Sequence, residues 1–151
     1  MNPEDMKNMF SLISLPFIFF LFCTQDGVSW KVTFCNKELL VATEEDQNKN
    51  VVSIRSADLD KPGRYLTLSY WEMNTISKKN GWKRSIIVFD ESDNQLIKKD
   101  SSAISLSANE LKKLFKERKK IKLFTISIPS DPSQAALVRI RRVHLCTLDL
   151  K

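Results

Sequence analysis

The chain has 151 residues, of which 24 are Lys or Arg and 18 are Asp or Glu, giving a net charge of +6. This length allows one domain to bury a core without disulfide support, which excludes the small disulfide-dependent folds. Only three glycines are present, which excludes a glycine-rich phosphate-binding loop, and the chain has neither low-complexity segments nor internal repeats.

An apolar run of fourteen uncharged residues, 10–23, follows Lys7 near the start of the chain. It is shorter than the roughly 20 residues that cross a bilayer as a helix, and it matches the apolar core of a secretory signal peptide. The sequence therefore predicts a signal peptide over residues 1–27 and a single domain over residues 28–151. The small residues Gly27 and Ser29 favour cleavage before Trp30.

Cys23 offers a second processing route, because lipid can be attached to a cysteine at the end of an apolar run. Phe22 stands where such a site normally has a small residue. Both routes predict an exported protein, periplasmic or extracellular, with membrane contact only through the leader or a lipidated Cys23. The alternative for the run is an amphipathic or core helix, which the lack of a polar face disfavours.

Alternating apolar and polar residues predict strands over most of the remaining chain. Turn signals separate them, including Lys61-Pro62-Gly63, Asn80-Gly81 and the polar residues 90–94, for which a hairpin turn is favoured over a calcium loop. The predicted strands cover residues 30–35, 38–43, 51–55, 64–73, 82–90, 95–99, 103–106, 121–128 and 137–150.

One helix is predicted after Ser107, because Ser107 and Glu110 have the spacing of a capping box and apolar residues follow on one face. A short helical turn is expected within residues 130–136. The alternation of the last strand slips, which predicts a bulge near Arg141 and Arg142. About nine short strands and one α-helix predict an antiparallel β-sandwich, with a β-barrel as the alternative.

The cysteines and the single histidine carry the sharpest chemical hypotheses. Export would permit a disulfide between Cys35 and Cys146, although two separate buried thiols are the alternative. His144 lies two residues before Cys146, so on a regular strand both side chains point to one face. With Cys35 they could bind Zn or Cu, or act in a thiol-dependent site, but a structural histidine beside a core cysteine is the competing interpretation.

Two further surfaces can be nominated for binding. Basic residues could bind a polyanion, although a solvated charged face is the ordinary outcome of such runs, and nucleic acid is disfavoured by export. Trp71 and Tyr70 could stack on a sugar, against the alternative of core or sheet-edge packing. The polyanion candidates are Lys112, Lys116, Lys119, Lys120, Arg139 and Arg141.

Three segments, residues 30–34 (WKVTF), 81–84 (GWKR) and 141–148 (RRVHLCTL), resemble small exported β-sandwich proteins of Bacteroidota-type bacteria. The resemblance implies export and no assigned activity, so it transfers no functional residue. We expect an exported, non-catalytic protein without a cofactor, which binds an anionic envelope polymer or another envelope protein or serves a structural role. The alternatives are a carbohydrate- or polyanion-binding module and a metal- or thiol-dependent protein.

Overall fold

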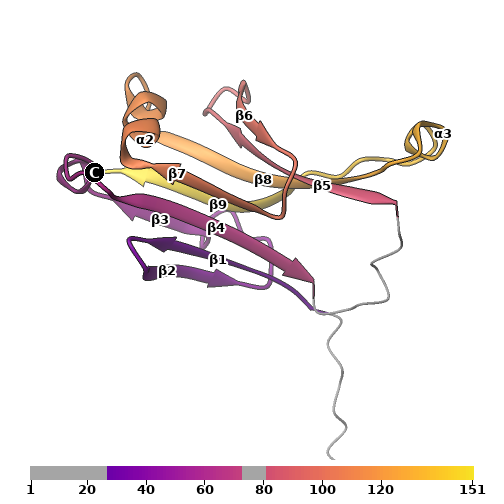
Figure 1. The fold of residues 1–151 in the computed structure, drawn as a ribbon, viewed down its shortest axis with the longest axis horizontal. Coiled ribbons are helices and arrows are strands. Elements are labelled where there is room, and N and C mark those ends of the chain that lie inside the picture. Colours follow the sequence, from indigo (N-terminus) through magenta and orange to yellow (C-terminus); the bar gives the residue numbers. More distant parts are fainter. Residues whose placement is uncertain (1–26, 73–80) are drawn as a thin grey trace, which may run out of the picture.

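Two β-sheets packed face to face form the body of the molecule (Figure 1), as the computed structural model shows for residues 27–72 and 81–151. Sheet A has the strand order β2-β1-β4-β7 and sheet B the order β3-β9-β8-β5-β6. The predicted mainly-β sandwich is confirmed, and neither sheet closes into a barrel. The predicted signal peptide, Cys23 and Asn80 lie outside the described residues, apart from Gly27.

The nine described strands correspond closely to the predicted ones, and three short helices accompany them. The strands are β1 (Val28–Phe34), β2 (Lys37–Ala42), β3 (Val51–Ile54), β4 (Tyr65–Glu72), β5 (Trp82–Phe89), β6 (Gln95–Lys99), β7 (Ala103–Ser107), β8 (Lys120–Pro129) and β9 (Val143–Leu150). The helices are α1 (Ser56–Leu59), α2 (Ala108–Phe115) and α3 (Pro132–Ala135).

The helix starts follow from their capping residues. Ser107 Oγ accepts a hydrogen bond from the Glu110 backbone N–H, and the Glu110 carboxylate accepts one from the Ser107 N–H, as the capping box predicted. Leu111 and Phe115 of α2 are buried, so the helix adds its apolar face to the core. Asp131 caps the one-turn α3, in the predicted place, whereas α1 was not predicted.

One strand pair is parallel, although the other described pairs are antiparallel. β3 runs beside β9, with Val51 opposite Thr147 and Ile54 opposite Leu150. Parallel neighbours need a long connection, and most of the chain lies between these two strands. Alternation of apolar residues identifies a strand but not its direction or its partner, so this pairing could not be predicted from the sequence.

The core lies between the sheets and takes every second side chain from most strands. Sheet A contributes Trp30, Val32, Phe34, Leu66, Leu68, Tyr70, Ile104 and Leu106. Sheet B contributes Val52, Ile54, Ile86, Val88, Ile121, Leu123, Leu145, Cys146 and Leu148. The opposite face of sheet B carries a smaller buried cluster of Ile87, Phe89, Phe124 and Ile126.

The bulge lies at Leu145, not near Arg141 and Arg142 as predicted. Leu123 pairs with Cys146 and Phe124 pairs with His144, so Leu145 has no opposite residue on β8. The buried Trp30 indole donates from Nε1 to the Leu145 carbonyl oxygen over 2.7 Å, which joins the two sheets. β9 also begins only at Val143, because residues 137–142 form no ladder pairs and most of them are exposed.

We expect Trp30→Phe to lower the free energy of unfolding by about 1–3 kcal/mol, because it leaves the buried Leu145 carbonyl without its donor. Urea unfolding followed by circular dichroism measures the change. Trp82→Phe is the matched control, since Trp82 is 46% exposed and should change stability by no more than about 0.5 kcal/mol. Equal stability of the two variants would contradict the importance of the indole hydrogen bond.

Candidate functional site

The structure forms neither the candidate Cys35–Cys146 disulfide nor the candidate Cys35–His144–Cys146 metal site, and it agrees with the alternatives of separate thiols and a structural histidine. Both cysteines are free thiols, and no group of three metal-ligating side chains exists within residues 27–72 and 81–151. The bulge at Leu145 separates His144 from Cys146, because it turns Cys146 into the core while His144 packs on Phe124 of the opposite face. The same divergence prevents a Cys–His nucleophile pair.

Burial affects both the Cys146 thiol and the His144 imidazole ring. Cys146 is fully buried, which raises the pKa of its thiol and keeps it protonated. The His144 ring is also buried, with its Nε2 atom 3.0 Å from Thr147 Oγ1, while Nδ1 has no hydrogen-bond partner. Its backbone N–H donates to Glu45 over 2.8 Å. These contacts indicate a structural histidine.

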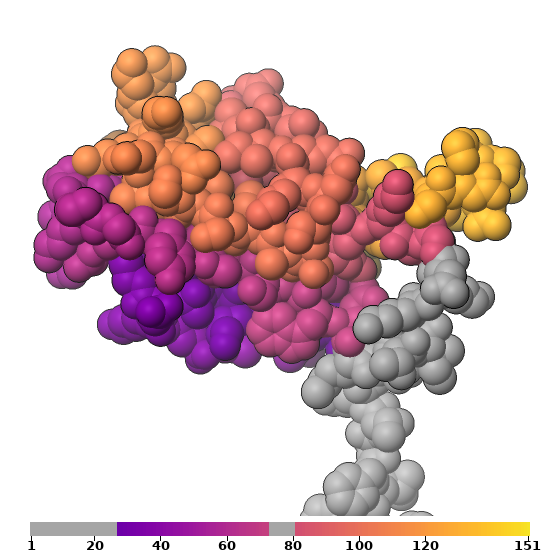
Figure 2. Space-filling model, viewed as in Figure 1, coloured from indigo at the N-terminus to yellow at the C-terminus, as the bar shows by residue number. Residues whose placement is uncertain are grey.

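The six polyanion candidates do not form one surface. Lys112 and Lys116 belong to α2 and its end, and Lys112 pairs with Asp60. Arg139 and Arg141 follow α3, which lies at the opposite end of the long axis from α2 (Figure 1). Figure 2 shows the α3 segment projecting from the body of the molecule. Lys119 and Lys120 lie beside the start of β8. The candidates are therefore spread over separate regions with nearby acidic groups.

The two predicted sugar-stacking residues are separated by the pleat of β4. Tyr70 is in the core, 7% exposed, with its ring stacked 6.2 Å from that of Trp30, so it cannot receive a sugar from the surface. Trp71 is 41% exposed on the outer face of sheet A. The Lys31 ammonium lies 6.0 Å from the centre of the Trp71 ring. Only Trp71 thus remains available for stacking.

Tyr65 is a second exposed ring on β4, which the sequence interpretation did not place on the outer face. It is 43% exposed and shares the outer face with Trp71, because the two positions differ by six, an even number, along β4. Positions 65 and 71 are both odd-numbered, so the sequence alone places them on the same face of one strand. Hydroxyl side chains from β1, β4 and β7 occupy the face between the two rings. We define the sheet A platform as Ser29, Lys31, Thr33, Tyr65, Thr67, Ser69, Trp71 and Ser105.

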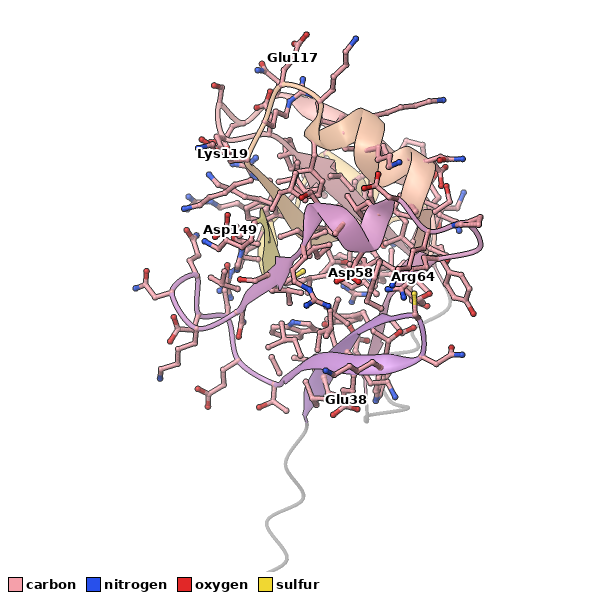
Figure 3. All side chains as sticks on the ribbon, turned by 90° about the vertical axis from the view of Figure 1, so that its left-hand side faces the viewer. Glu38, Asp58, Arg64, Glu117, Lys119 and Asp149 are labelled. Carbon is pink, nitrogen blue, oxygen red and sulfur yellow. The ribbon has the colours of Figure 1, made fainter. Side chains whose placement is uncertain are left out.

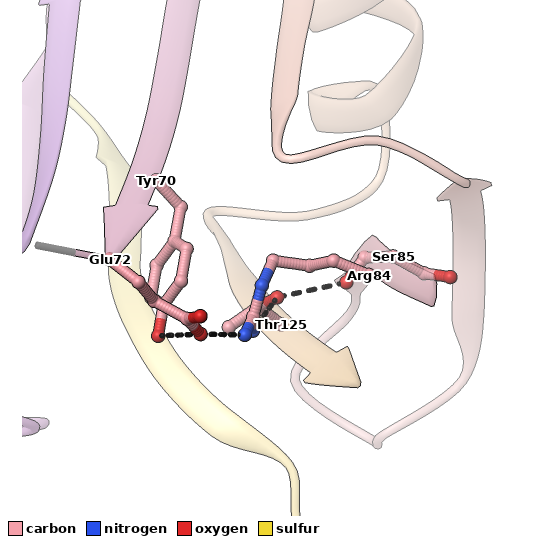
Figure 4. A network of polar contacts seen from close by, with 5 residues as sticks. All are labelled: Tyr70, Glu72, Arg84, Ser85 and Thr125. Carbon is pink, nitrogen blue, oxygen red and sulfur yellow. Dashed lines mark hydrogen bonds and ion pairs between the residues drawn. The ribbon is translucent and has the colours of Figure 1, made fainter. Parts of the chain in front are cut away.

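A polar network fixes the end of β4 beside Trp71 (Figure 4). The Arg84 guanidinium pairs with the Glu72 carboxylate, donates to Thr125 Oγ1 over 3.3 Å and lies 4.2 Å from the centre of the Tyr70 ring. Thr125 Oγ1 in turn donates to the Ser85 carbonyl over 3.0 Å. Because β4 belongs to sheet A and Arg84 to sheet B, the network holds the two sheets together at this end.

Comparison with known proteins gives no relative for this chain: no family model, no curated protein and no solved structure matches. Within the described residues, no helix has the length and apolar character needed to cross a membrane.

We expect the stability of the fold to fall as the pH drops below about 6.5, the ordinary pKa of His144. Burial lowers the pKa of His144, with Lys122 adding to the shift and Glu45 opposing it. The unfolded chain therefore binds a proton before the folded one, and stability rises with pH within this window by at most about 1.4 kcal/mol per unit.

Chemical unfolding of the wild type and of His144→Gln at several pH values between 5 and 7 measures this effect. The variant should show a flatter pH dependence in that window, whatever its absolute stability. The carboxylates with lowered pKa values, such as Asp90 and Asp149, titrate at more acidic pH and leave the window clear. An unchanged slope in the variant would show that His144 is not the responsible group.

Proposed function

We propose that this chain is an exported, non-catalytic binding protein that holds a carbohydrate polymer on the sheet A platform. The observation that carries the proposal is the pair of exposed rings, Tyr65 and Trp71, on one face of a single strand. Six residue steps along the strand separate them by about 20 Å, a span that several sugar units cover. A polymer, unlike a single sugar, can contact both rings at once.

The side chains between the rings suit a sugar ligand. Serine and threonine hydroxyls both donate and accept hydrogen bonds, as sugar hydroxyls do. Thr67 and Ser105 lie across neighbouring strands, with their hydroxyl oxygens 3.3 Å apart. Aromatic faces offer an apolar surface to the C–H groups of a sugar ring. The competing interpretation is a plain solvated sheet face, which would bind no polymer.

Lys31 favours an acidic polymer over a neutral one. Its ammonium group lies at the Trp71 ring, where a uronic acid carboxylate would meet it. This placement agrees with the expected anionic envelope polymer and needs none of the scattered basic residues of α2 and the α3 segment. A non-catalytic role is supported by the burial of His144, the single histidine, away from this face.

Export is supported by the apolar residues 10–23 and by the start of the fold directly after the leader. β1 begins at Val28, so cleavage before Trp30 would remove Val28 and Ser29, which pair with Glu72 and Trp71. Cleavage before Val28 would keep the whole strand. Anchoring through a lipidated Cys23 would leave the domain intact as well.

Trp71→Ala and Tyr65→Ala should each weaken binding of polygalacturonate about 2- to 10-fold, the size expected for one aromatic contact. The double variant should lose more than either single one. Affinity electrophoresis in gels with polygalacturonate, alginate or neutral xylan measures the change. Trp82→Ala is the matched control, because it removes an equally exposed tryptophan from β5 of sheet B. No binding to any polymer, or equal loss in the control, would contradict the proposal.

Mass spectrometry of the protein from the cells that make it should show a mature chain that lacks the apolar residues 10–22. The new N-terminus is expected between Cys23 and Trp30, with a diacylglycerol mass increment if Cys23 is the first residue. Cytosolic protein expressed without the leader provides the unmodified reference mass. Recovery of the intact 151-residue chain from the envelope or medium would contradict processing as a signal peptide.

A further inference from the structure

A cleft at one end of the sandwich is a second candidate site, separate from the sheet A platform. It opens where the turn after β1 meets the end of β3 and the helix α1, and it has a volume of about 450 Å³. This size lies within the range of small-molecule pockets. Figure 3 looks onto this end of the molecule, with Asp58 and Arg64 labelled. The lining residues are Phe34, Cys35, Lys37, Leu39, Ser53, Ile54, Arg55, Asp58 and Arg64.

The inner part of this end cleft is apolar. Phe34 and Ile54 come from the two sheets and belong to the main core, and Leu39 of β2 packs against that core. The bulge between β1 and β2 leaves Leu39 without an opposite residue, and Glu38 pairs with Thr33. Apolar walls of this kind favour the hydrocarbon part of a ligand over a fully hydrated ion.

The rim of the end cleft is cationic. Asp58 accepts hydrogen bonds from Arg55 Nε over 2.9 Å and from Arg64 Nη1 over 3.0 Å. These contacts, the one to Arg55 first, hold the pKa of the Asp58 carboxyl below its usual range, so it stays ionised. Lys37 has no ion-pair partner among the described residues. Among the charged lining residues, Lys37, Arg55 and Arg64 are cations and Asp58 is the one carboxylate. Their charges sum to +2 beside the apolar walls.

We propose that the end cleft binds a small organic carboxylate with an apolar body. The carboxylate meets Arg64 and Lys37 at the rim, and the hydrocarbon part lies along Phe34, Leu39 and Ile54. The Arg64 guanidinium lies 5.9 Å from the centre of the Phe34 ring, so the charged and apolar parts of the site adjoin. Inorganic anions would leave the apolar walls unused, which separates this site from a general anion patch.

Cys35 provides a reporter inside the end cleft. Its thiol is partly exposed and lines the cleft, whereas Cys146 is fully buried and should stay unmodified in the folded protein. Iodoacetate and iodoacetamide alkylate the same thiolate with loss of iodide, but only iodoacetate carries a negative charge. Both rates depend equally on the fraction of Cys35 that is ionised, so this fraction drops out of their ratio. The ratio therefore measures the local electrostatic potential at Cys35.

The test uses the purified full chain and peptide mass mapping, which separates Cys35 from the other cysteines. The ratio of iodoacetate to iodoacetamide rates should be about three- to sixfold higher in the folded protein than in urea. This is the size expected for one or two unit charges several ångströms away in water. Arg64→Gln and Lys37→Gln should lower the ratio, and Lys37→Gln leaves both contacts of Asp58 in place. Arg139→Gln is the matched control.

Ligand protection completes the test. Octanoate should slow alkylation of Cys35 by both reagents, and octanamide, which has the same chain without the charge, should slow it less. Arg64→Gln or Lys37→Gln should remove the difference between the two compounds, while Arg139→Gln should keep it. Equal rate ratios in folded and unfolded protein, or equal protection by octanoate and octanamide, would overturn the proposal. The sheet A platform is untouched by these variants, so the two proposals fail separately.

Discussion

The hydrogen bond from Trp30 to the Leu145 carbonyl is the contact on which the arrangement of sheet B depends. A buried indole N–H needs an acceptor, and a carbonyl on a regular inner strand is already used by the ladder. Leu145 is the bulge residue without an opposite residue on β8, and its carbonyl oxygen accepts the hydrogen bond from Trp30. The bulge also turns both Leu145 and Cys146 into the core and leaves His144 on the other face. The bulge residue Leu145 thus provides the acceptor for the Trp30 indole N–H. It also places the side chains of His144 and Cys146 on opposite faces of β9.

The sequence predicts the local parts of this fold well because local physics determines them. Alternation along β4 assigned Leu66, Leu68 and Tyr70 to one face, and the capping residues of α2 fixed where it begins. The parallel β3–β9 pair, the position of the bulge and the late start of β9 depend on contacts between distant segments. Residue spacing carries no information about such contacts, so it could not decide whether Cys35, His144 and Cys146 come together.

The sheet A platform can be predicted from the sequence, whereas the end cleft cannot. Tyr65 and Trp71 share a parity on one strand, so their common face follows from the pleat alone. The end cleft is different, because Cys35, Arg55 and Arg64 come from three separate turns and meet only when the two sheets pack. Their spacing matches no known motif. Such a site becomes visible only in the folded molecule.

The side chains of β4 point alternately into the core and onto the proposed binding surface. Its inward residues Leu66 and Leu68 are fully buried beside β1 and β7, while the outward Tyr65 and Trp71 add little to the core. The Arg84–Glu72 pair secures the same strand end from the other sheet, next to Trp71. A substitution on the outer face can therefore change a ligand contact without changing the core. A strand built in this way gives rigid positions for two rings, and rigidity lowers the entropic cost of binding a polymer.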